Sequence, residues 1–328
     1  MGKEYVENIT SIKGRTTSLK NFCKQNGFID VGIAKVALLE KEYNNYQQWI
    51  DNSFHGTMSY LEKFSQRQNI KEILPEAKSV IVTATNYYTP IQHPSILSEN
   101  EGKISRYAWG EDYHFSVKDR LVLTENFLKE LSKDSISKSY VDTGPILEKA
   151  WAVRAGLGWQ GKHSNVISRN HGSWFFIGII LSSLEFEYDS PVKDMCGSCT
   201  ACIEACPTNA IVDPYIVDGT KCISYWTIET KPDIPIPKEI AKNLDTWAFG
   251  CDRCQDVCPW NRFQKETTET IFSPRENQTT LTFQEVANLT DDEFRIRFNR
   301  SPIKRTKLAG LKRNFTALQS GSDSKIKL

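Results

Sequence analysis

The sequence predicts an α/β domain over residues 1–186, a small cysteine-rich domain over residues 187–265 and a short helical region over residues 266–328. Strand-like and helix-like patterns alternate through the first part, which is typical of α/β architecture. Eight of the nine cysteines fall between Cys196 and Cys258, where short loops and prolines replace regular periodicity. A length of 328 residues and a hydrophobic content of 39% suit two or three ordinary globular domains.

Hydrophobic periodicity and turn residues place the elements of the first part. Gly27 is typical of a residue that ends a helix, and the β-branched tract from Ser79 to Tyr87 is typical of a buried strand. An apolar stripe after Phe115 favours an amphipathic helix. We therefore expect helices at 18–27, at 43–64 with a break near 55–56, and at 115–131, and strands at 28–34 and 79–87.

The second half of this part should continue the alternation. A short strand at 138–142 runs into a Thr-Gly-Pro turn, and we expect Pro145 to lie in the first turn of a helix that ends near Ala155. Residues 165–183 predict a hairpin whose second strand is long and buried. After the cysteine-rich part, helices should resume from Thr280, and the last eight residues should fray.

Asp142 follows a predicted strand and precedes a predicted helix. Ligand sites of α/β sheets favour such positions. An N-terminal helix cap is the alternative, because Asp readily accepts backbone N–H groups there. Glu148, on the next helix, could contact nothing more than solvent. Position alone therefore leaves a catalytic role for Asp142 open.

Nothing in the sequence favours a membrane or secretion. The longest strongly apolar run, at 174–184, is about half of the roughly 20 residues that cross a bilayer. The first 20 residues mix Lys, Glu and Asn and lack an apolar signal region. We therefore expect a cytoplasmic protein with no membrane segment. Its many cysteines favour metal or redox chemistry, because the cytosol keeps thiols reduced.

The cysteine tract from Cys196 to Pro207 has the spacing C-x2-C-x2-C-x3-C-P of bacterial ferredoxins. A second tract, at 251–259, repeats this spacing with one cysteine missing, and Cys222 stands between the two. In two-cluster ferredoxins the fourth cysteine of a run binds the other cluster. The spacing therefore predicts a ferredoxin-like domain with two 4Fe-4S clusters, one bound by Cys196, Cys199, Cys202 and Cys258, the other by Cys206, Cys222, Cys251 and Cys254.

Structural zinc is the main alternative for these cysteines, since zinc is also held by four thiolates. Zinc ligands usually come as two separated CxxC pairs, whereas three cysteines in a row followed by Cys-Pro do not divide that way. The remaining cysteine, Cys23, lies in a predicted helix and should be a small buried hydrophobic residue.

Charge is unevenly distributed along the chain. Residues 295–313 carry eight basic and no acidic side chains, although the net charge of the whole chain is only +1. This asymmetry predicts contact with a polyanion, with a solvated basic helix as the alternative. Aromatic and basic side chains at 106–109 and 225–226 could stack on unpaired bases. The glycine-rich tract at 156–165 could cradle a ligand, but its spacing matches no known phosphate loop.

Several motifs together resemble the epoxyqueuosine reductase family. They are His55-Gly-Thr-Met58-Ser-Tyr60-Leu, Arg106-Tyr-Ala-Trp-Gly-Glu-Asp-Tyr-His114, Val141-Asp-Thr-Gly-Pro145, Gly158-Trp-Gln-Gly-Lys-His-Ser-Asn165, the two cysteine tracts and Cys222-Ile-Ser-Tyr-Trp-Thr-Ile-Glu229. Together they cover most of residues 15–315. Some family members carry a longer helical-repeat extension, for which this chain stops too early.

The resemblance implies a fold, a reaction and two cofactors. The N-terminal domain would bind cobalamin, and electrons from the clusters would reduce its cobalt to a nucleophilic state. The substrate would be epoxyqueuosine at the wobble position of a tRNA, reduced to queuosine in the last step of queuosine biosynthesis. An external electron donor would supply the electrons.

The resemblance also implies roles for individual residues. Asp142 would be the proton donor. The cobalamin pocket would include Met58, Tyr60, Lys162, His163, Ser164, Asn165 and Ser224. The RNA contacts would include Arg106, Tyr107, Trp226, Lys231, Arg297, Arg300, Lys304 and Arg305.

Two other functions remain open from the sequence. A corrinoid reductive dehalogenase would share the corrin and the two clusters, but such enzymes typically begin with a twin-arginine export signal, which the sequence lacks. A ferredoxin-type electron carrier without its own catalysis would bind no corrin and would have no use for Asp142.

Overall fold

A four-stranded antiparallel sheet forms the centre of the first part of the molecule. The computed structural model describes residues 11–62, 65–94 and 100–323. The sheet has the strand order β1-β2-β7-β4, with β1 at Asp30–Lys35, β2 at Ser79–Asn86, β4 at Ser137–Tyr140 and β7 at Phe175–Ser182. All three pairings are antiparallel.

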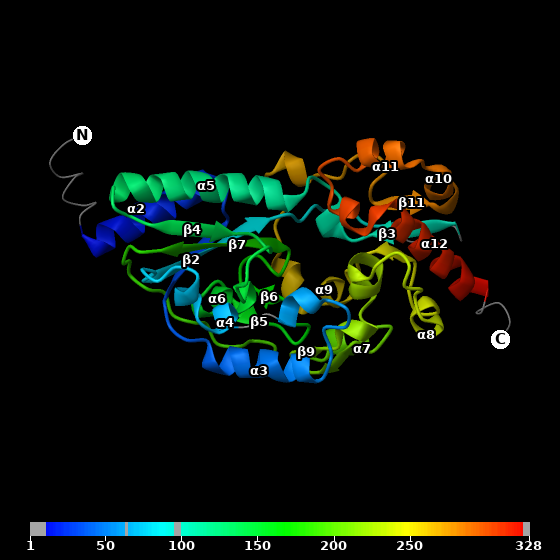
Figure 1. Cartoon of the computed structure of the whole chain (residues 1–328), viewed down its shortest axis with the longest axis horizontal. Coiled ribbons are helices and arrows are strands. Elements are labelled where there is room, and N and C mark those ends of the chain that lie inside the picture. Colours follow the sequence, from blue (N-terminus) through cyan, green and yellow to red (C-terminus); the bar gives the residue numbers. More distant parts are fainter. Residues whose placement is uncertain (1–10, 63–64, 95–99, 324–328) are drawn as a thin grey trace.

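Helices cover both faces of this sheet (Figure 1). Helices α2 and α5 lie on one face, and α3, α4 and α6 lie on the other. Their bounds are Ile12–Gln25 for α2, Glu40–Asp51 for α3, Ser65–Gln68 for α4, Tyr113–Leu131 for α5 and Glu148–Arg154 for α6.

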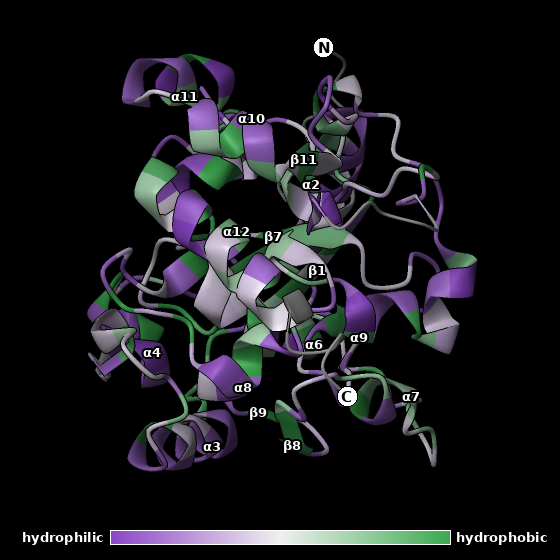
Figure 2. Cartoon of the chain, turned by 90° about the vertical axis from the view of Figure 1, so that its right-hand side faces the viewer, coloured by the Kyte–Doolittle hydropathy of each residue, from purple (hydrophilic) through white to green (hydrophobic). Residues whose placement is uncertain are grey.

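The two faces have separate cores because side chains alternate along each strand. In β7, Ile180 packs under α2 and α5, whereas its neighbours Ile179 and Leu181 pack on the opposite face with Trp151 of α6. Figure 2 shows the strands at the centre as hydrophobic and the outer helices α3 and α11 as mostly hydrophilic. The long apolar run predicted as a buried strand is confirmed as β7.

The predicted hairpin at 165–183 is wrong in its main pairing. Strand β6 at Val166–Ile167 pairs with β5 at Trp159–Gln160, and only Ser168 and Gly172 bridge across the turn. Strand β7 instead pairs with β2 and β4, because its fully apolar sequence suits the middle of the sheet. Pro145 also lies ahead of α6 rather than in its first turn, since α6 begins at Glu148.

Short elements build the cysteine-rich part and the C-terminal region. The helices there are α7 at Ala201–Glu204, α8 at Lys238–Ala241, α9 at Arg253–Asp256, α10 at Phe283–Asn288, α11 at Asp291–Arg297 and α12 at Lys307–Asp323. Strand β8 at Ile211–Asp213 pairs with strand β9 at Ile216–Val217. Of the eight residues expected to fray, 321–323 belong to α12 and 324–328 lie outside the described residues.

A second, three-stranded sheet joins the three predicted parts of the chain. Its order is β10-β3-β11, with β3 at Glu101–Ile104, β10 at Trp247–Phe249 and β11 at Thr280–Thr282. Its core includes Ile104, Phe249 and Leu281, one residue from each strand. The cysteine-rich part and the C-terminal region therefore share one hydrophobic core with a segment of the first part. Within the described residues no helix is long and apolar enough to cross a membrane.

Candidate active site

The eight clustered cysteines form two neighbouring sets in the structure. The thiol of Cys202 interacts electrostatically with Cys258, Cys196 and Cys199. The thiol of Cys254 interacts with Cys222 and Cys206, and that of Cys251 with Cys254 and Cys222. These are the two groups of four that the spacing predicts. Cys254 also interacts with Cys202, so the two sets lie close together.

The cysteine environment suits thiolates that bind a cluster. Backbone N–H groups point at the sulfurs: the amide of Ala210 donates to Cys206 Sγ over 3.2 Å, and the amides of Tyr225 and Ser224 donate to Cys222. Hydrogen bonds of this kind tune iron–sulfur clusters. Burial raises the pKa of the Cys202 thiol to about 11, so a bound cation is needed to hold a thiolate there.

Zinc is the alternative occupant of each set. Zinc holds its four sulfurs about 2.3 Å from a common centre. Among the described residues, no three His, Cys, Asp or Glu side chains converge in that way. The described cysteines are also all free of disulfides. Two sets of four free thiols match the ligand number of two 4Fe-4S clusters.

The glycine-rich tract supports the first cysteine set. Lys162 is buried, and its Nζ donates to the carbonyl oxygens of Gly197 (2.7 Å) and Cys199 (2.9 Å). The neighbouring His163 is also buried, and its Nδ1 accepts the N–H of Asn165 over 3.2 Å. The amine of Lys162 already donates to the cysteine loop. A contact between Lys162 and the corrin therefore stays a prediction.

Asp142 lies in a turn after β4 with a left-handed φ of 54°, a conformation that Asp tolerates better than most residues. Its side chain is 60% exposed and accepts a hydrogen bond of 2.6 Å from the Tyr113 hydroxyl. His114 Nε2 lies 4.0 Å from the same carboxylate. The N–H of Asp142 donates to Glu148 Oε1 over 2.7 Å, so the expectation that Glu148 contacts only solvent is wrong.

The sheet does not place Asp142 in the way the strand pattern suggests. The rule that ligands bind at the carboxyl ends of strands applies to parallel sheets, and this sheet is antiparallel. The side chains of Tyr113 and Glu148 fix the turn instead. Burial and the charge of Asp142 raise the pKa of Glu148 to about 8, so Glu148 is largely neutral at pH 7.

Lys149 connects Asp142 with the second cysteine set. Its Nζ donates to Asn165 Oδ1 over 3.0 Å. Desolvation lowers the pKa of Lys149, and the negative charges of Asp142, Cys254, Glu148 and Cys222 oppose that shift. The side chain nevertheless remains exposed to solvent. It also lines a cavity of about 80 Å³ together with Asn165, Tyr87 and Gln255. Lys149 is therefore a solvent-exposed side chain that interacts with both Asp142 and the second cysteine set.

A second carboxylate, Glu229, lies in the neighbourhood of Asp142. Glu229 Oε2 accepts hydrogen bonds from Arg305 (2.7 Å) and from the Tyr60 hydroxyl (3.3 Å). Burial, Glu229 and Asp142 together raise the pKa of Tyr60 to about 12. They also raise the pKa of Tyr107 far above its usual value. Both carboxylates therefore lie near the same two phenols.

The His-Gly-Thr-Met motif latches the first part onto the cysteine-rich part. The backbone N–H and the hydroxyl of Thr57 lie 2.8 Å and 2.9 Å from the Tyr225 hydroxyl. Gly56 has a φ of 58°, and a Cβ there would lie 2.3 Å from the same hydroxyl, so the contact requires glycine. Met58 and Ser224, predicted for the cobalamin pocket, are half-buried next to this latch.

The predicted RNA-contact residues divide into buried and exposed groups. Arg106 is 4% exposed and donates to the carbonyls of Thr89 and Ile91, so its guanidinium is not at the surface and its role here is packing. Tyr107 and Trp226 are half-buried. The exposed members are Lys231, Arg300, Lys304 and Arg305, while Arg297 is partly exposed.

Carboxylates neutralise much of the basic tail. Arg297 pairs with Glu285, Arg300 with Glu111 and Arg305 with Glu229. The guanidinium of Arg313 instead binds backbone carbonyls, including that of Trp226 over 2.7 Å. The tail is therefore less positive at its surface than its sequence indicates.

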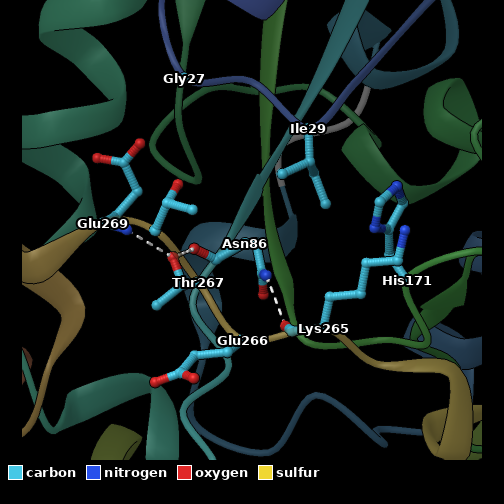
Figure 3. Close-up of a pocket in the computed structure, with 9 residues that line it drawn as sticks. Gly27, Ile29, Asn86, His171, Lys265, Glu266, Thr267 and Glu269 are labelled. Atoms are coloured by element: carbon cyan, nitrogen blue, oxygen red, sulfur yellow. Dashed lines mark hydrogen bonds between the residues drawn. The ribbon is translucent and has the colours of Figure 1, made fainter.

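A larger cavity, of about 190 Å³, lies away from these residues. Figure 3 shows its lining, in which Asn86 donates to the carbonyl of Lys265 and Thr267 donates to the carbonyl of Asn86. His171 and Glu269 complete the rim. These hydrogen bonds fasten the segment at 265–269 to the end of β2, and the lining includes none of the predicted site residues.

Sequence reasoning missed Tyr113, Lys149 and Glu229 as members of the site. Tyr113 and Glu229 belong to the family motifs given above, but a motif does not show which side chains contact each other. Lys149 had no such signal beyond its place one residue after Glu148.

An α/β part joined to two sets of four thiols, with Lys149 interacting with both Asp142 and the second set, is typical of an iron–sulfur oxidoreductase. Two family models match the chain: epoxyqueuosine reductase QueG, DUF1730, over residues 67–143, and the 4Fe-4S double cluster binding domain over residues 195–261.

Whole-chain comparisons agree. The epoxyqueuosine reductase of Cellulophaga algicola is 46% identical over 294 residues, covering 89% of this chain and 94% of the relative. That of Synechocystis sp. is 46% identical over 290 residues, covering 88% and 99%. The chain therefore belongs to the epoxyqueuosine reductase family.

Solved structures show the same fold. A crystal structure of epoxyqueuosine reductase with an epoxyqueuosine-modified tRNA-Tyr stem loop has a TM-score of 0.85 at 28% identity, over 92% of this chain and 80% of that one. The Bacillus subtilis enzyme, with a TM-score of 0.84, 27% identity and the same coverage, is described with its aspartate-bearing catalytic loop swung out of the active site.

Proposed function

We propose that this protein reduces epoxyqueuosine to queuosine at the wobble position of tRNA. The observation that carries the proposal is the arrangement around Lys149, which interacts with Asp142 on one side and with Cys254 and Cys222 on the other. A proton donor and an electron source thus meet at one space. Removing the epoxide oxygen as water and leaving an alkene takes two electrons and two protons, and two one-electron clusters match that demand.

The two cysteine sets would carry electrons in series. The first set reaches the surface at Cys199, which is exposed, although Cys202 and Cys258 are buried; the four members of the second set are all partly exposed. An external electron donor would therefore reduce the cluster at Cys196, Cys199, Cys202 and Cys258. The neighbouring cluster would then pass electrons towards the space at Lys149.

The side chains near Asp142 and Lys149 support a cobalamin site by their chemistry. His163 Nε2 is buried without a hydrogen-bond partner among the described residues, and Lys149 offers a solvent-accessible cation. The residues that would hold the cofactor are Met58, Tyr60, Lys162, His163, Ser164, Asn165 and Ser224, with Lys162 acting through the cysteine loop that it fixes. Once reduced, the cobalt of cobalamin supplies a strong nucleophile for the epoxide.

Asp142 would donate the proton to the epoxide oxygen. Its side chain is exposed to the space and is oriented by the Tyr113 hydroxyl. Burial holds the pKa of Tyr113 far above its usual value, so this phenol stays protonated and keeps donating to the carboxylate. The catalytic loop of the Bacillus subtilis relative, which carries an aspartate, supports this role.

The tRNA would bind over the mouth of the site. The stem loop bound to a related enzyme supports this partner. The contacts would come from Tyr107, Trp226, Lys231 and the exposed tail residues Arg300, Lys304 and Arg305. In this view residues 1–186 bind cobalamin, residues 187–265 carry electrons and residues 266–328 help to bind RNA, in an enzyme of the cytoplasm.

Anaerobic reconstitution tests the proposal. The protein is loaded with iron and sulfide and assayed on epoxyqueuosine-containing tRNA, with and without cobalamin, under a chemical reductant. Queuosine formed only with cobalamin is the expected result. Reduction of a halogenated phenol but not of the tRNA would favour a dehalogenase, and cluster reduction without any product would favour an electron carrier.

A further inference from the structure

Glu229 is the last residue of a rigidly held π-helical segment, η5 at Tyr225–Glu229. Arg313 donates to the carbonyl of Trp226 over 2.7 Å and to the hydroxyl of Thr230 over 2.7 Å. Asn314 donates to the carbonyl of Thr227 over 2.8 Å. Helix α12 therefore fixes the backbone on both sides of the Glu229 side chain.

Two side chains orient the Glu229 carboxylate, and both bind the same oxygen. Arg305 and Tyr60 donate to Oε2, from the C-terminal region and from the first part of the chain. Among the described residues, no hydrogen bond reaches Oε1. The Glu229 side chain keeps 21% of its surface exposed, so the second oxygen can accept from a ligand.

Glu229 and Asp142 lie in the same neighbourhood, since Tyr60 donates to Glu229, Tyr113 donates to Asp142 and the rings of Tyr107 and Tyr113 lie 6.4 Å apart. Three side chains, those of Tyr60, Tyr107 and Arg305, interact electrostatically with both Glu229 and Asp142. If Asp142 protonates the epoxide, Glu229 lies where the rest of the same nucleoside must extend. That part is a guanine-type base, whose N1–H and exocyclic amine form an edge of donors.

We propose that Glu229 is a specificity-determining residue whose Oε1 accepts a hydrogen bond from the exocyclic amine of the wobble base. This inference rests on the proposed function. Oε1, which neither Arg305 nor Tyr60 binds, can accept from the exocyclic amine of this edge, and it rejects bases that present an acceptor there. Recognition of unpaired bases through this edge is the usual way in which proteins read single-stranded RNA.

An ion pair that serves only to hold Arg305 is the competing explanation, and it makes a different prediction. Such a pair would affect every RNA equally. A hydrogen bond to the base would distinguish guanosine from inosine, which lacks the exocyclic amine.

The test compares two anticodon stem loops that differ only in guanosine or inosine at the wobble position. Their affinities for the cobalamin-loaded, cluster-containing protein are measured by fluorescence anisotropy. We expect the wild type to bind the guanosine loop about tenfold more tightly, and Glu229→Gln to bring this ratio close to one. Glu239→Gln removes an exposed carboxylate of the same region that pairs with Lys242, and it should keep the wild-type ratio.

Glu229→Asp provides a second variant if the amide disturbs the fold. It keeps the charge for Arg305 but withdraws the carboxylate, so the ratio should again fall while iron content stays at the wild-type level. An unchanged ratio in either folded variant, or an equal weakening of both loops, would overturn the inference. Failure of the proposed function would instead appear as wild-type protein that binds the loops but forms no queuosine.

Discussion

The two cysteine sets have nearly the same ligands but opposite surroundings. The first set includes the exposed Cys199 in a loop whose residues 197–200 all face solvent. The second set has no exposed member and adjoins Lys149 and the space at Asp142. Solvent exposure and nearby charge both tune cluster potentials. This difference supports the proposed electron entry at the first set and electron delivery from the second.

The strongest test of this comparison removes one thiol of the second set. We expect Cys254→Ser to abolish queuosine formation, because electrons can no longer pass through the second set to the site at Asp142. The first cluster should remain and should still be reduced by dithionite, as measured by iron content and electron paramagnetic resonance. Loss of both clusters together would show that the two sets are not separable sites.

The next effect concerns the proton rather than the electron. Asp142→Asn should lower turnover by about 10² to 10⁴, the usual contribution of a positioned acid. Iron content and cobalamin binding should be unchanged, because Asn still accepts the Tyr113 hydroxyl. Asp119→Asn, an exposed substitution on α5, is the matched control. Wild-type turnover in the Asp142 variant would end its assignment as proton donor.

A smaller effect should separate the two clusters by their potentials. Lys149→Met removes a cation near Cys254 and Cys222 and should make the second cluster harder to reduce. A tenfold change in the reduction equilibrium, about 59 mV for one electron, is a reasonable scale. Redox titration followed by electron paramagnetic resonance should find the first cluster unchanged, and Lys242→Met should change neither. Equal shifts of both clusters would contradict the comparison.

The smallest effect tests how well the space near the second set excludes water. Glu148 has an ordinary pKa of 4.5 when unfolded and about 8 when folded. The unfolded chain therefore loses this proton first as pH rises, so stability falls between about pH 4.5 and pH 8. Glu148→Gln should show a smaller drop in Tm from pH 5 to pH 8 than the wild type. Equal drops would mean that water screens this carboxyl.

Local patterns predicted the longest strands, and they predicted cysteine groups whose members interact in the structure, although the cluster that each group binds stays a prediction. The tract at 79–87 became β2, and the long apolar run became β7, because β-branched and apolar runs are local signals. The crossover of Cys258 to the first set followed from a spacing rule. None of these required knowledge of distant contacts.

The remaining features depend on contacts between segments far apart in sequence. The antiparallel partners of β7 could not be deduced from its own residues. Glu148 was expected to face solvent, yet it binds the backbone of Asp142. Arg106 was expected at an RNA surface, yet it is buried against Trp109. In each case the partner, not the residue type, decided the role.

The sheet of β10, β3 and β11 has a practical consequence for anyone dissecting this molecule. Cutting the chain after residue 265 would strip one edge strand from β3 and leave Ile104 and Phe249 facing water. Neither the fragment that ends at residue 265 nor the fragment that begins at residue 266 should then fold as a separate soluble protein. The enzyme is best engineered by point substitution, not by exchanging modules.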